Sequence, residues 1–284
     1  MFYEILENVR RKSPLIHCMT NYVTVNDCAN IISAIGGSSV MSDEILEVED
    51  VVAFCDGLLV NIGTLNERTI KAMRVTMNKA NLLHKPIVFD PVGAGATKYR
   101  NDVSIDFVTN NKQTVIKGNA TEIKALHGDL NEERENRGID ANVFDTVTKG
   151  NMKTYAKIAM ELSEQTGAVI VITGSIDIVA SEDDAYFLFN GSNEMGEVVG
   201  TGCQLGAMIA TFVSADKENI FNATAAAVCL YGIAGSNVNY DIDGKCDLMS
   251  LKTDLCNNLY NFEREFYESN YNFKTYRQIV ALRE

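Results

Sequence analysis

Short apolar runs alternate with longer amphipathic segments along the first part of the chain. The runs do not alternate apolar with polar residues, so each is expected to be a strand buried on both faces, as in a parallel sheet covered by helices. The predicted strands are residues 15–19, 38–41, 57–62, 86–90, 114–116 and 168–172. The predicted helices cover about residues 2–9, 23–35, 66–83, 102–111 and 151–165. The pattern predicts an α/β fold with a mainly parallel central sheet, but it does not give the strand order.

The pattern changes in the last part of the chain. Residues 176–180 and 186–189 flank an acidic turn and predict an antiparallel hairpin at one edge of the sheet. Helices are expected afterwards, over about residues 205–212, 220–233 and 248–267. The polar and acidic stretch from about Gly128 to Lys149 is expected to be a solvated excursion rather than a domain boundary. We therefore expect residues 1–284 to form a single domain.

Composition and charge limit the possible ligands. The chain has 284 residues, of which 46% are hydrophobic and 22% are charged, and this balance favours an ordered globular protein. The formal net charge of −13 argues against a nucleic-acid partner, because such partners usually bind a basic face. An anionic ligand would be repelled by this charge, so its binding would need local amides, a few Lys or Arg side chains and a divalent cation.

The cysteines, histidines and terminal segment favour a cytoplasmic protein without zinc. The seven cysteines lie far apart with no CxxC pair, so a disulfide framework is not expected. The first residues mix acids with apolar side chains, unlike a secretory signal, and no apolar run approaches the ~20 residues of a membrane span. The three histidines lack metal-ligand spacing, which argues against a zinc site.

One glycine-rich stretch has the features of an anion site. Gly200-Thr201-Gly202-Cys203 stands directly before an apolar, alanine-rich run that reads as a buried helix. The first-turn N–H groups of a helix lack intrahelical partners, and the helix dipole adds roughly half a positive charge, so a phosphate oxygen can bind there. The alternative is a tight loop that merely begins a core helix.

Polar residues also follow three predicted strands. Asp90 ends a strand, and Pro91 keeps it extended so that its carboxylate points past the sheet edge, where ligands of parallel sheets bind. Asn119 and Glu122 have the spacing of a capping box, but Glu122 could instead hold water on a magnesium ion whose outer ligands include Asp90. Thr173 opens a third junction, which could also be a simple turn. With the glycine loop these make four junctions, expected to follow four parallel strands and to meet on one rim.

These motifs, in this order, resemble the ribokinase-like superfamily of small-molecule kinases, which implies a three-layer fold with helices on both faces of the sheet. The superfamily motifs are Asn119-x-x-Glu122, Thr173-Gly-x-x-Asp177 and Gly200-Thr-Gly202-Cys203. Within it, the chain from about residue 13 to 235 resembles the hydroxyethylthiazole kinase family. The segments that carry this resemblance are Leu15–Val23, Val40-Met41-Ser42, Asp90–Ala94 and Cys203.

The resemblance implies an activity and a set of site residues. The family phosphorylates the hydroxyl of 5-(2-hydroxyethyl)-4-methylthiazole with ATP and Mg²⁺ in thiamine salvage, and is typically a homotrimer with active sites between subunits. The implied substrate-binding residues are Asn21, Met41 and Gly200, the ATP-binding residues Lys117, Thr173 and Gly202, the magnesium-supporting residues Asp90 and Glu122, and the catalytic residue Cys203.

Two positions depart from the usual patterns. The family usually has Arg where this chain has Lys117, which keeps the charge but loses bidentate phosphate recognition. Most ribokinase-like enzymes have Asp where Cys203 stands. A helix N-terminus favours the thiolate of a cysteine, so a modest role as general base is expected, although nearby phosphate charge opposes it.

Other functions fit the sequence less well. An ATP- or ADP-dependent dehydratase of hydrated NAD(P)H shares the fold but should carry Asp in the glycine loop. A covalent cysteine enzyme would need a base near Cys203, and no histidine supplies a local motif. A hydride-transferring Rossmann enzyme would need GxGxxG after an early strand, which is absent. A catalytically silent nucleotide-binding protein remains an alternative.

Overall fold

The computed structural model describes residues 2–131, 146–237 and 247–281. The strands are β1 (Leu15–Met19), β2 (Ser38–Val40), β3 (Gly57–Asn61), β4 (Ile87–Asp90), β5 (Val115–Asn119), β6 (Val169–Thr173), β7 (Asp177–Ala180), β8 (Ala185–Leu188) and β9 (Phe273–Thr275). The helices are α1 (Phe2–Lys12), α2 (Val25–Ala34), α3 (Val48–Phe54), α4 (Glu67–Leu82), α5 (Lys98–Asn110), α6 (Ala120–Leu130), α7 (Met152–Thr166), η2 (Asn193–Gly196), α8 (Thr201–Ala215), α9 (Ile220–Ser236), α10 (Leu248–Tyr260), α11 (Arg264–Asn270) and α12 (Tyr276–Ala281).

The strands form one sheet of nine, in the order β2-β1-β3-β4-β5-β6-β7-β8-β9. All pairs from β2 to β6 are parallel, and the strands from β6 to β9 pair in antiparallel fashion. Every residue of β3 and β4 is buried, as the unbroken apolar runs indicate. The mainly parallel sheet and the hairpin β7–β8 are therefore confirmed. The predicted place of the hairpin at one edge of the sheet was wrong, because β9 pairs with the outer side of β8.

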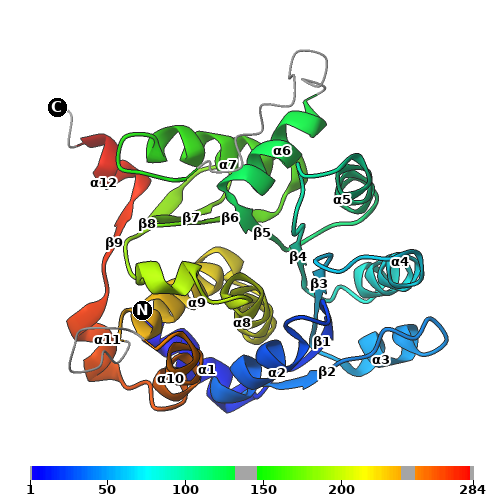
Figure 1. Ribbon diagram of the computed structural model, residues 1–284, viewed down its shortest axis with the longest axis horizontal. Coiled ribbons are helices and arrows are strands. Elements are labelled where there is room, and N and C mark those ends of the chain that lie inside the picture. Colours follow the sequence, from blue (N-terminus) through cyan, green and yellow to red (C-terminus); the bar gives the residue numbers. More distant parts are fainter. Residues whose placement is uncertain (1, 132–145, 238–246, 282–284) are drawn as a thin grey trace.

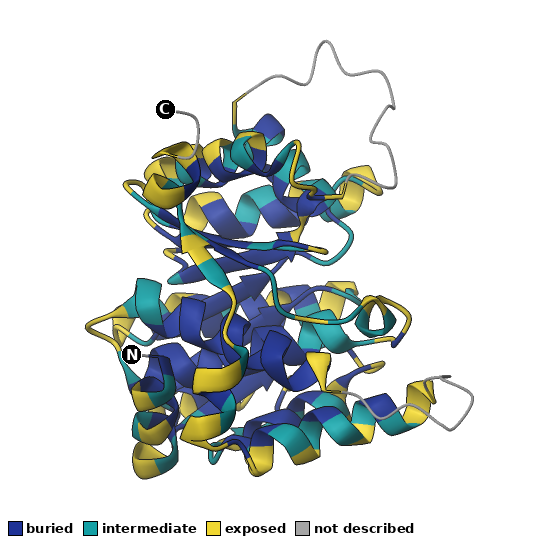
Figure 2. Cartoon of the chain, turned by 90° about the vertical axis from the view of Figure 1, so that its left-hand side faces the viewer, coloured by how far each residue is buried: buried dark blue, intermediate teal, exposed yellow. Residues whose placement is uncertain are grey.

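Helices cover both faces of this sheet, which gives the three layers that the resemblance implies (Figure 1). Successive side chains of a strand point to opposite faces, and the core divides accordingly. Leu59 and Val88 pack with α1, α2, α8 and α9, whereas Val60 and Phe89 pack with α4, α5 and α6. Figure 2 shows buried residues concentrated in the strands and in the helices nearest to them, with exposed residues on the outer surfaces.

Helices α8 and α9 are the most deeply enclosed. Every residue of α8 from Gln204 to Ala215 is buried, as expected for a helix that is apolar on all sides. A Cβ placed on Gly206 would lie 3.5 Å from both Asp90 Oδ2 and the Leu59 side chain, so this glycine allows α8 to approach β3 and β4 closely. No helix in the described part of the chain is both long and apolar enough to cross a membrane.

The structure corrects several sequence-based boundaries. The helix predicted over about 248–267 is two helices, α10 and α11, because the backbone is extended at Glu263 (φ −114°, ψ 160°). Phe262, between the two helices, is 1% exposed and packs edge-on against Phe266. The helix predicted from residue 102 begins at Lys98, after Thr97 accepts a hydrogen bond from Arg100 N. The short helix α3 was not predicted.

The start of the predicted solvated excursion over about 128–149 lies in a helix. Its first residues, Gly128–Leu130, belong to helix α6, so there the prediction was wrong. Residues 132–145 lie outside the described residues.

A cap at the start of α4 provides a test of local stability. Asn66 Oδ1 accepts from Thr69 N at 3.1 Å, and Thr69 Oγ1 accepts from Asn66 N at 3.1 Å. Replacing Asn66→Ala removes the first bond and is expected to lower the free energy of unfolding by about 1 kcal/mol, measured by urea denaturation. Asn219→Ala is the matched control, because Asn219 occupies the same position at α9 without a side-chain cap. Equal losses in the two variants would mean that the Asn66 cap contributes nothing.

Candidate active site

The ends of four neighbouring strands bring polar residues to one rim of the sheet. Asn61 and Asp90 are paired in register as the last residues of β3 and β4, and Asn119 and Thr173 are paired as the last residues of β5 and β6. Parallel strands in register end at the same edge, so the three strand-end junctions predicted from the sequence do meet. Asn61 was not among the predicted site residues.

The glycine loop reaches this rim by a different route from the one predicted. It does not follow a parallel strand, because the preceding strand is the antiparallel β8 and the short helix η2 lies between them. The loop reaches the rim because α8 packs against β3 and β4, with Gly206 beside Asp90. The prediction of four parallel-strand junctions was therefore wrong for this one.

Gly200 is required by the backbone at the start of α8. It has φ +100°, a left-handed conformation that side chains rarely adopt, and an added Cβ would lie 2.7 Å from Thr24 Cγ2. Gly200 caps the helix without a side chain, and the first intrahelical bond runs from Gln204 N to Gly200 O. The amides of residues 201–203, in the first turn of α8, precede this bond and have no acceptor within the helix, so they could bind an anion.

Cys203 belongs to this first turn of α8, and its sulfur accepts two hydrogen bonds. Its Sγ accepts from Asn21 Nδ2 at 3.3 Å and from Asn61 Nδ2 at 3.2 Å. The orientation of both amides is fixed, because Asn21 Oδ1 accepts from Val23 N and Asn61 Oδ1 accepts from Gly63 N. The sulfur is therefore held as a hydrogen-bond acceptor on the predicted anion site.

A buried ion pair lies next to the cysteine. Asp90 Oδ2 accepts from Lys117 Nζ at 3.1 Å and from Asn61 Nδ2 at 2.9 Å, while Oδ1 is buried without a partner in the described residues. Burial raises the pKa of Asp90, with Glu122 adding to the shift and Lys117 opposing it. Burial by itself would lower the pKa of Lys117, but the charges of Asp90 and Glu122 outweigh it and raise that pKa.

Glu122 forms the capping box that its spacing predicts. Its Oε2 accepts from Asn119 N at 2.7 Å, and Asn119 Oδ1 accepts from Glu122 N at 2.9 Å. Its other oxygen accepts from Gly93 N at 2.8 Å, in the loop after β4. Both carboxylate oxygens thus bind backbone amides. Within residues 2–131, 146–237 and 247–281, no three His, Cys, Asp or Glu side chains form a ready-made metal site.

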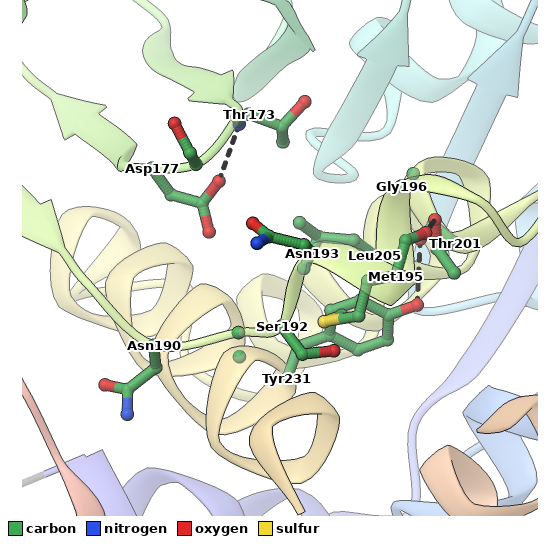
Figure 3. Close-up of a pocket in the computed structure, with 15 residues that line it drawn as sticks. Thr173, Asp177, Asn190, Ser192, Asn193, Met195, Gly196, Thr201, Leu205 and Tyr231 are labelled. Carbon is green, nitrogen blue, oxygen red and sulfur yellow. Dashed lines mark hydrogen bonds between the residues drawn. The ribbon is translucent and has the colours of Figure 1, made fainter. Parts of the chain in front are cut away.

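A cavity of about 310 Å³ lies among four elements (Figure 3). These are the end of β6, helix η2, the first turn of α8 and the last turns of α9. Its lining includes two predicted ATP-binding residues, Thr173 and Gly202. Lys117 lies behind Gly202, where an added Cβ would be 3.3 Å from Nζ. Asp177 and Asn193 direct their polar ends into the same space (Figure 3). The three residues assigned to ATP are thus on or next to one cavity.

Asp177 lines this cavity and has a raised pKa. Burial raises the pKa of Asp177 to about 7, although Gly174 N donates to its carboxylate at 2.9 Å and opposes the shift. The side chain remains partly accessible from the cavity. Near neutral pH it can therefore be either a hydrogen-bond donor or an anion.

Met41, a predicted substrate-binding residue, lies near the edge of the sheet. It follows the edge strand β2 and is 36% exposed. Asn21, by contrast, contacts Cys203 directly.

Arg100 is a residue that sequence reasoning missed. Its guanidinium donates to Ile62 O at 2.8 Å and Gly63 O at 2.9 Å, and it also donates to Val92 O. It therefore joins the loops that follow β3 and β4. No local motif marks this role, because the partners are backbone carbonyls that only the fold brings together.

The mostly parallel sheet, covered by helices on both faces, has the fold of ribokinase-like proteins. A ribokinase-like superfamily protein from Enterococcus faecalis aligns with a TM-score of 0.62 over 92% of this chain and 89% of that chain. It is 14% identical in sequence, so this likeness concerns the fold alone.

The chain belongs to the hydroxyethylthiazole kinase family, whose model matches residues 6–265. Hydroxyethylthiazole kinase of Clostridium acetobutylicum is 47% identical over 235 residues, which cover 83% of this chain and 85% of that relative. The solved hydroxyethylthiazole kinase protein of Pyrococcus horikoshii OT3 is 31% identical, with a TM-score of 0.84 over 96% of this chain and 98% of that chain. The family and fold expected from the motifs are confirmed.

Replacing Gly200→Ala tests the need for the left-handed start of α8. Both backbone strain and the contact with Thr24 oppose the substitution, so a loss of more than about 2 kcal/mol in the free energy of unfolding is expected by urea denaturation. Gly167→Ala is the matched control, since Gly167 has φ +70° with nothing within 4 Å of an added Cβ. If the two variants lose equal stability, the Thr24 contact has no energetic effect.

Asp177→Asn tests the raised pKa. A carboxyl group with a folded-state pKa above its unfolded value of about 4 favours folding less as the pH rises toward 7, because the folded state binds the proton more tightly. The variant is therefore expected to gain thermal stability over wild type at pH 8 but little at pH 4, measured by melting temperature. Asp184→Asn, on the β7–β8 turn, controls for the loss of one charge. A gain that is the same at both pH values would contradict the prediction.

Proposed function

We propose that the protein transfers the γ-phosphoryl group of ATP to the hydroxyl of 5-(2-hydroxyethyl)-4-methylthiazole in thiamine salvage. The observation that carries this proposal is the family match over residues 6–265, which includes the glycine loop and its cysteine. The catalytic task is mainly positioning and charge stabilisation, because the transition state of phosphoryl transfer is loose. The amides at the start of α8 would bind the transferred group, and Lys117 would neutralise part of its charge.

The cavity beside Thr173 and Gly202 is proposed to hold the nucleotide. Its place at the first turn of α8 would direct the terminal phosphates toward Gly200 and Cys203. Lys117 would contact the phosphates as a point charge, without the bidentate bonds of the Arg that the family usually has. The thiazole alcohol would lie on the other side of the glycine loop, against Asn21 and Met41.

Magnesium is proposed as the cofactor, supported by Asp90 and Glu122. Asp90 Oδ1 is buried and has no partner among the described residues, so it is available to a cation or to one of its waters. Glu122 already binds two amides and would act through water. This fits Mg²⁺, which retains waters and takes phosphate oxygens as ligands. When bound, the ion would neutralise charge on the phosphates.

A homotrimer with active sites between subunits is proposed, with a cytoplasmic location. Large apolar side chains are exposed around the predicted substrate site, including Tyr22 at 80%, Leu46 at 89% and Val199 at 71%. Exposed apolar surface of this kind favours a protein partner. A neighbouring subunit would cover these residues and complete the pocket around Met41.

The direct test is turnover with ATP, Mg²⁺ and the thiazole alcohol, monitored as ADP release and as the phosphorylated thiazole by mass spectrometry. We expect stoichiometric formation of both products. Nucleotide binding without either product would indicate a catalytically silent protein, and repair of hydrated NADH with ATP or ADP would indicate the dehydratase.

Cys203 is proposed as the general base that accepts the proton of the substrate hydroxyl. Cys203→Ala is expected to lower kcat about 100-fold, and Cys203→Asp to retain much more activity, since general-base catalysis typically contributes factors of this size. Cys256→Ala, at another partly buried thiol, is the control and should leave kcat unchanged. Full activity of Cys203→Ala would show that the sulfur is not the base.

A further inference from the structure

Asn61 lies between the Asp90 carboxylate and the Cys203 sulfur in the candidate active site. It is the last residue of β3, is 1% exposed, and donates one amide hydrogen to Asp90 Oδ2 and the other to Cys203 Sγ. We propose that Asn61 is a positioning residue for phosphoryl transfer, which holds the Cys203 sulfur as a proton acceptor under the glycine loop. This inference rests on the proposed base role of Cys203.

The hydrogen bonds of Asn61 leave it one orientation. Its Oδ1 accepts from Asn21 Nδ2 at 3.0 Å and from Gly63 N at 2.9 Å. A backbone N–H can only donate, so the oxygen must face Gly63 and the NH₂ group must face Asp90 and Cys203. Both donors and both acceptor positions of the side chain are used, which is the arrangement that makes a buried polar network rigid.

The backbone on both sides of Asn61 is also fixed in position by its neighbours. Strand β3 is buried throughout, and Arg100 binds the carbonyls of Ile62 and Gly63 directly after it. A residue on a rigid element, with its rotamer fixed by several bonds, can place a reacting group more accurately than one on a loop. Asn61 therefore fixes the sulfur relative to the sheet, and not only relative to α8.

The amide of Asn61 is suited to support transfer of the substrate hydroxyl proton to Cys203. In the reaction the substrate O–H bond breaks and its proton passes to Sγ, the oxygen bonds to the γ-phosphorus, and ADP leaves with the electrons of the broken P–O bond. The N–H groups that Asn61 and Asn21 donate to the sulfur hold it in place as the acceptor of this proton. Aspartate at position 61 would present no amide N–H and would face Asp90 at the 2.9 Å that now separates Asn61 Nδ2 from Oδ2.

A double-mutant cycle tests whether Asn61 acts through the sulfur. Asn61→Ala is expected to lower kcat about tenfold or more with little change in the KM for the thiazole alcohol, because a hydrogen bond to the reacting group is lost. In the Cys203→Ala background the same substitution should change kcat less than twofold. An equal loss in both backgrounds would overturn the proposal, since Asn61 would then act independently of Cys203.

Alkylation tests the same contact without turnover. Iodoacetamide reacts with the thiolate, so its rate at Cys203, followed by mass spectrometry of the peptide, is expected to fall about tenfold in Asn61→Ala. Cys256 in the same sample is the reference thiol. Unchanged or faster alkylation at Cys203 would overturn the proposal even if Cys203→Ala proves inactive. If Cys203→Ala keeps full activity while alkylation slows, the base role fails and the Asn61 contact stands.

Two further variants test whether the effects of Asn61→Ala come from a disturbed fold and not from the lost hydrogen bond to Cys203. Asn61→Leu keeps nearly the same side-chain volume but has no amide hydrogens and places no charge beside Asp90, so it should slow alkylation as Asn61→Ala does, and it replaces that variant if the alanine protein is unfolded by circular dichroism. Asn111→Ala removes another buried asparagine, 6% exposed and outside this site, and should leave both kcat and alkylation unchanged. Loss of alkylation in Asn111→Ala would mean that any buried truncation disturbs Cys203, which would overturn the proposal.

Discussion

The ion pair of Asp90 and Lys117 is the constraint on which the site depends. The two side chains are 0% and 5% exposed, and an isolated charge at such depth would cost several kcal/mol. Each charge therefore requires the other, and the carboxylate also requires the amide of Asn61. Because these groups come from β3, β4 and β5, the pair keeps three strand ends together directly under the start of α8.

The loops that follow these strands are fixed by their backbone groups. Arg100 binds carbonyls in the loops after β3 and β4. Glu122 binds the amide of Gly93, in the loop after β4, and the amide of Asn119, the last residue of β5. Gly206 has no side chain, so α8 can lie close to Asp90. This close packing determines how far the glycine loop at the start of α8 lies from the sheet. The groups that would stabilise transition-state charge are thus oriented before any substrate binds, which is the main source of electrostatic catalysis.

The sequence predicted the features that depend on local pattern. The parallel strands were located to within a few residues because each is a buried apolar run, and Asp90 and Thr173 could be assigned to one rim because each ends such a run. Features that depend on contacts between distant segments were missed. Phe262 continues the apolar pattern of α10, yet the helix is interrupted there by the extended backbone at Glu263. Asn61 contacts Cys203 across 142 positions of sequence without any motif. The roles of the site residues in binding and catalysis remain predictions.

The pairing of β8 with β9 affects how the protein is made. Between these two strands, in sequence, lie the glycine loop and the buried helices α8 and α9, and β9 pairs with β8 only through residues 273–275. During synthesis β8 therefore emerges well before β9, and the outer edge of β8 stays unpaired until residues 273–275 are made. An unpaired strand edge can pair with another chain, so this edge is expected to be the part of the nascent sheet most prone to aggregation.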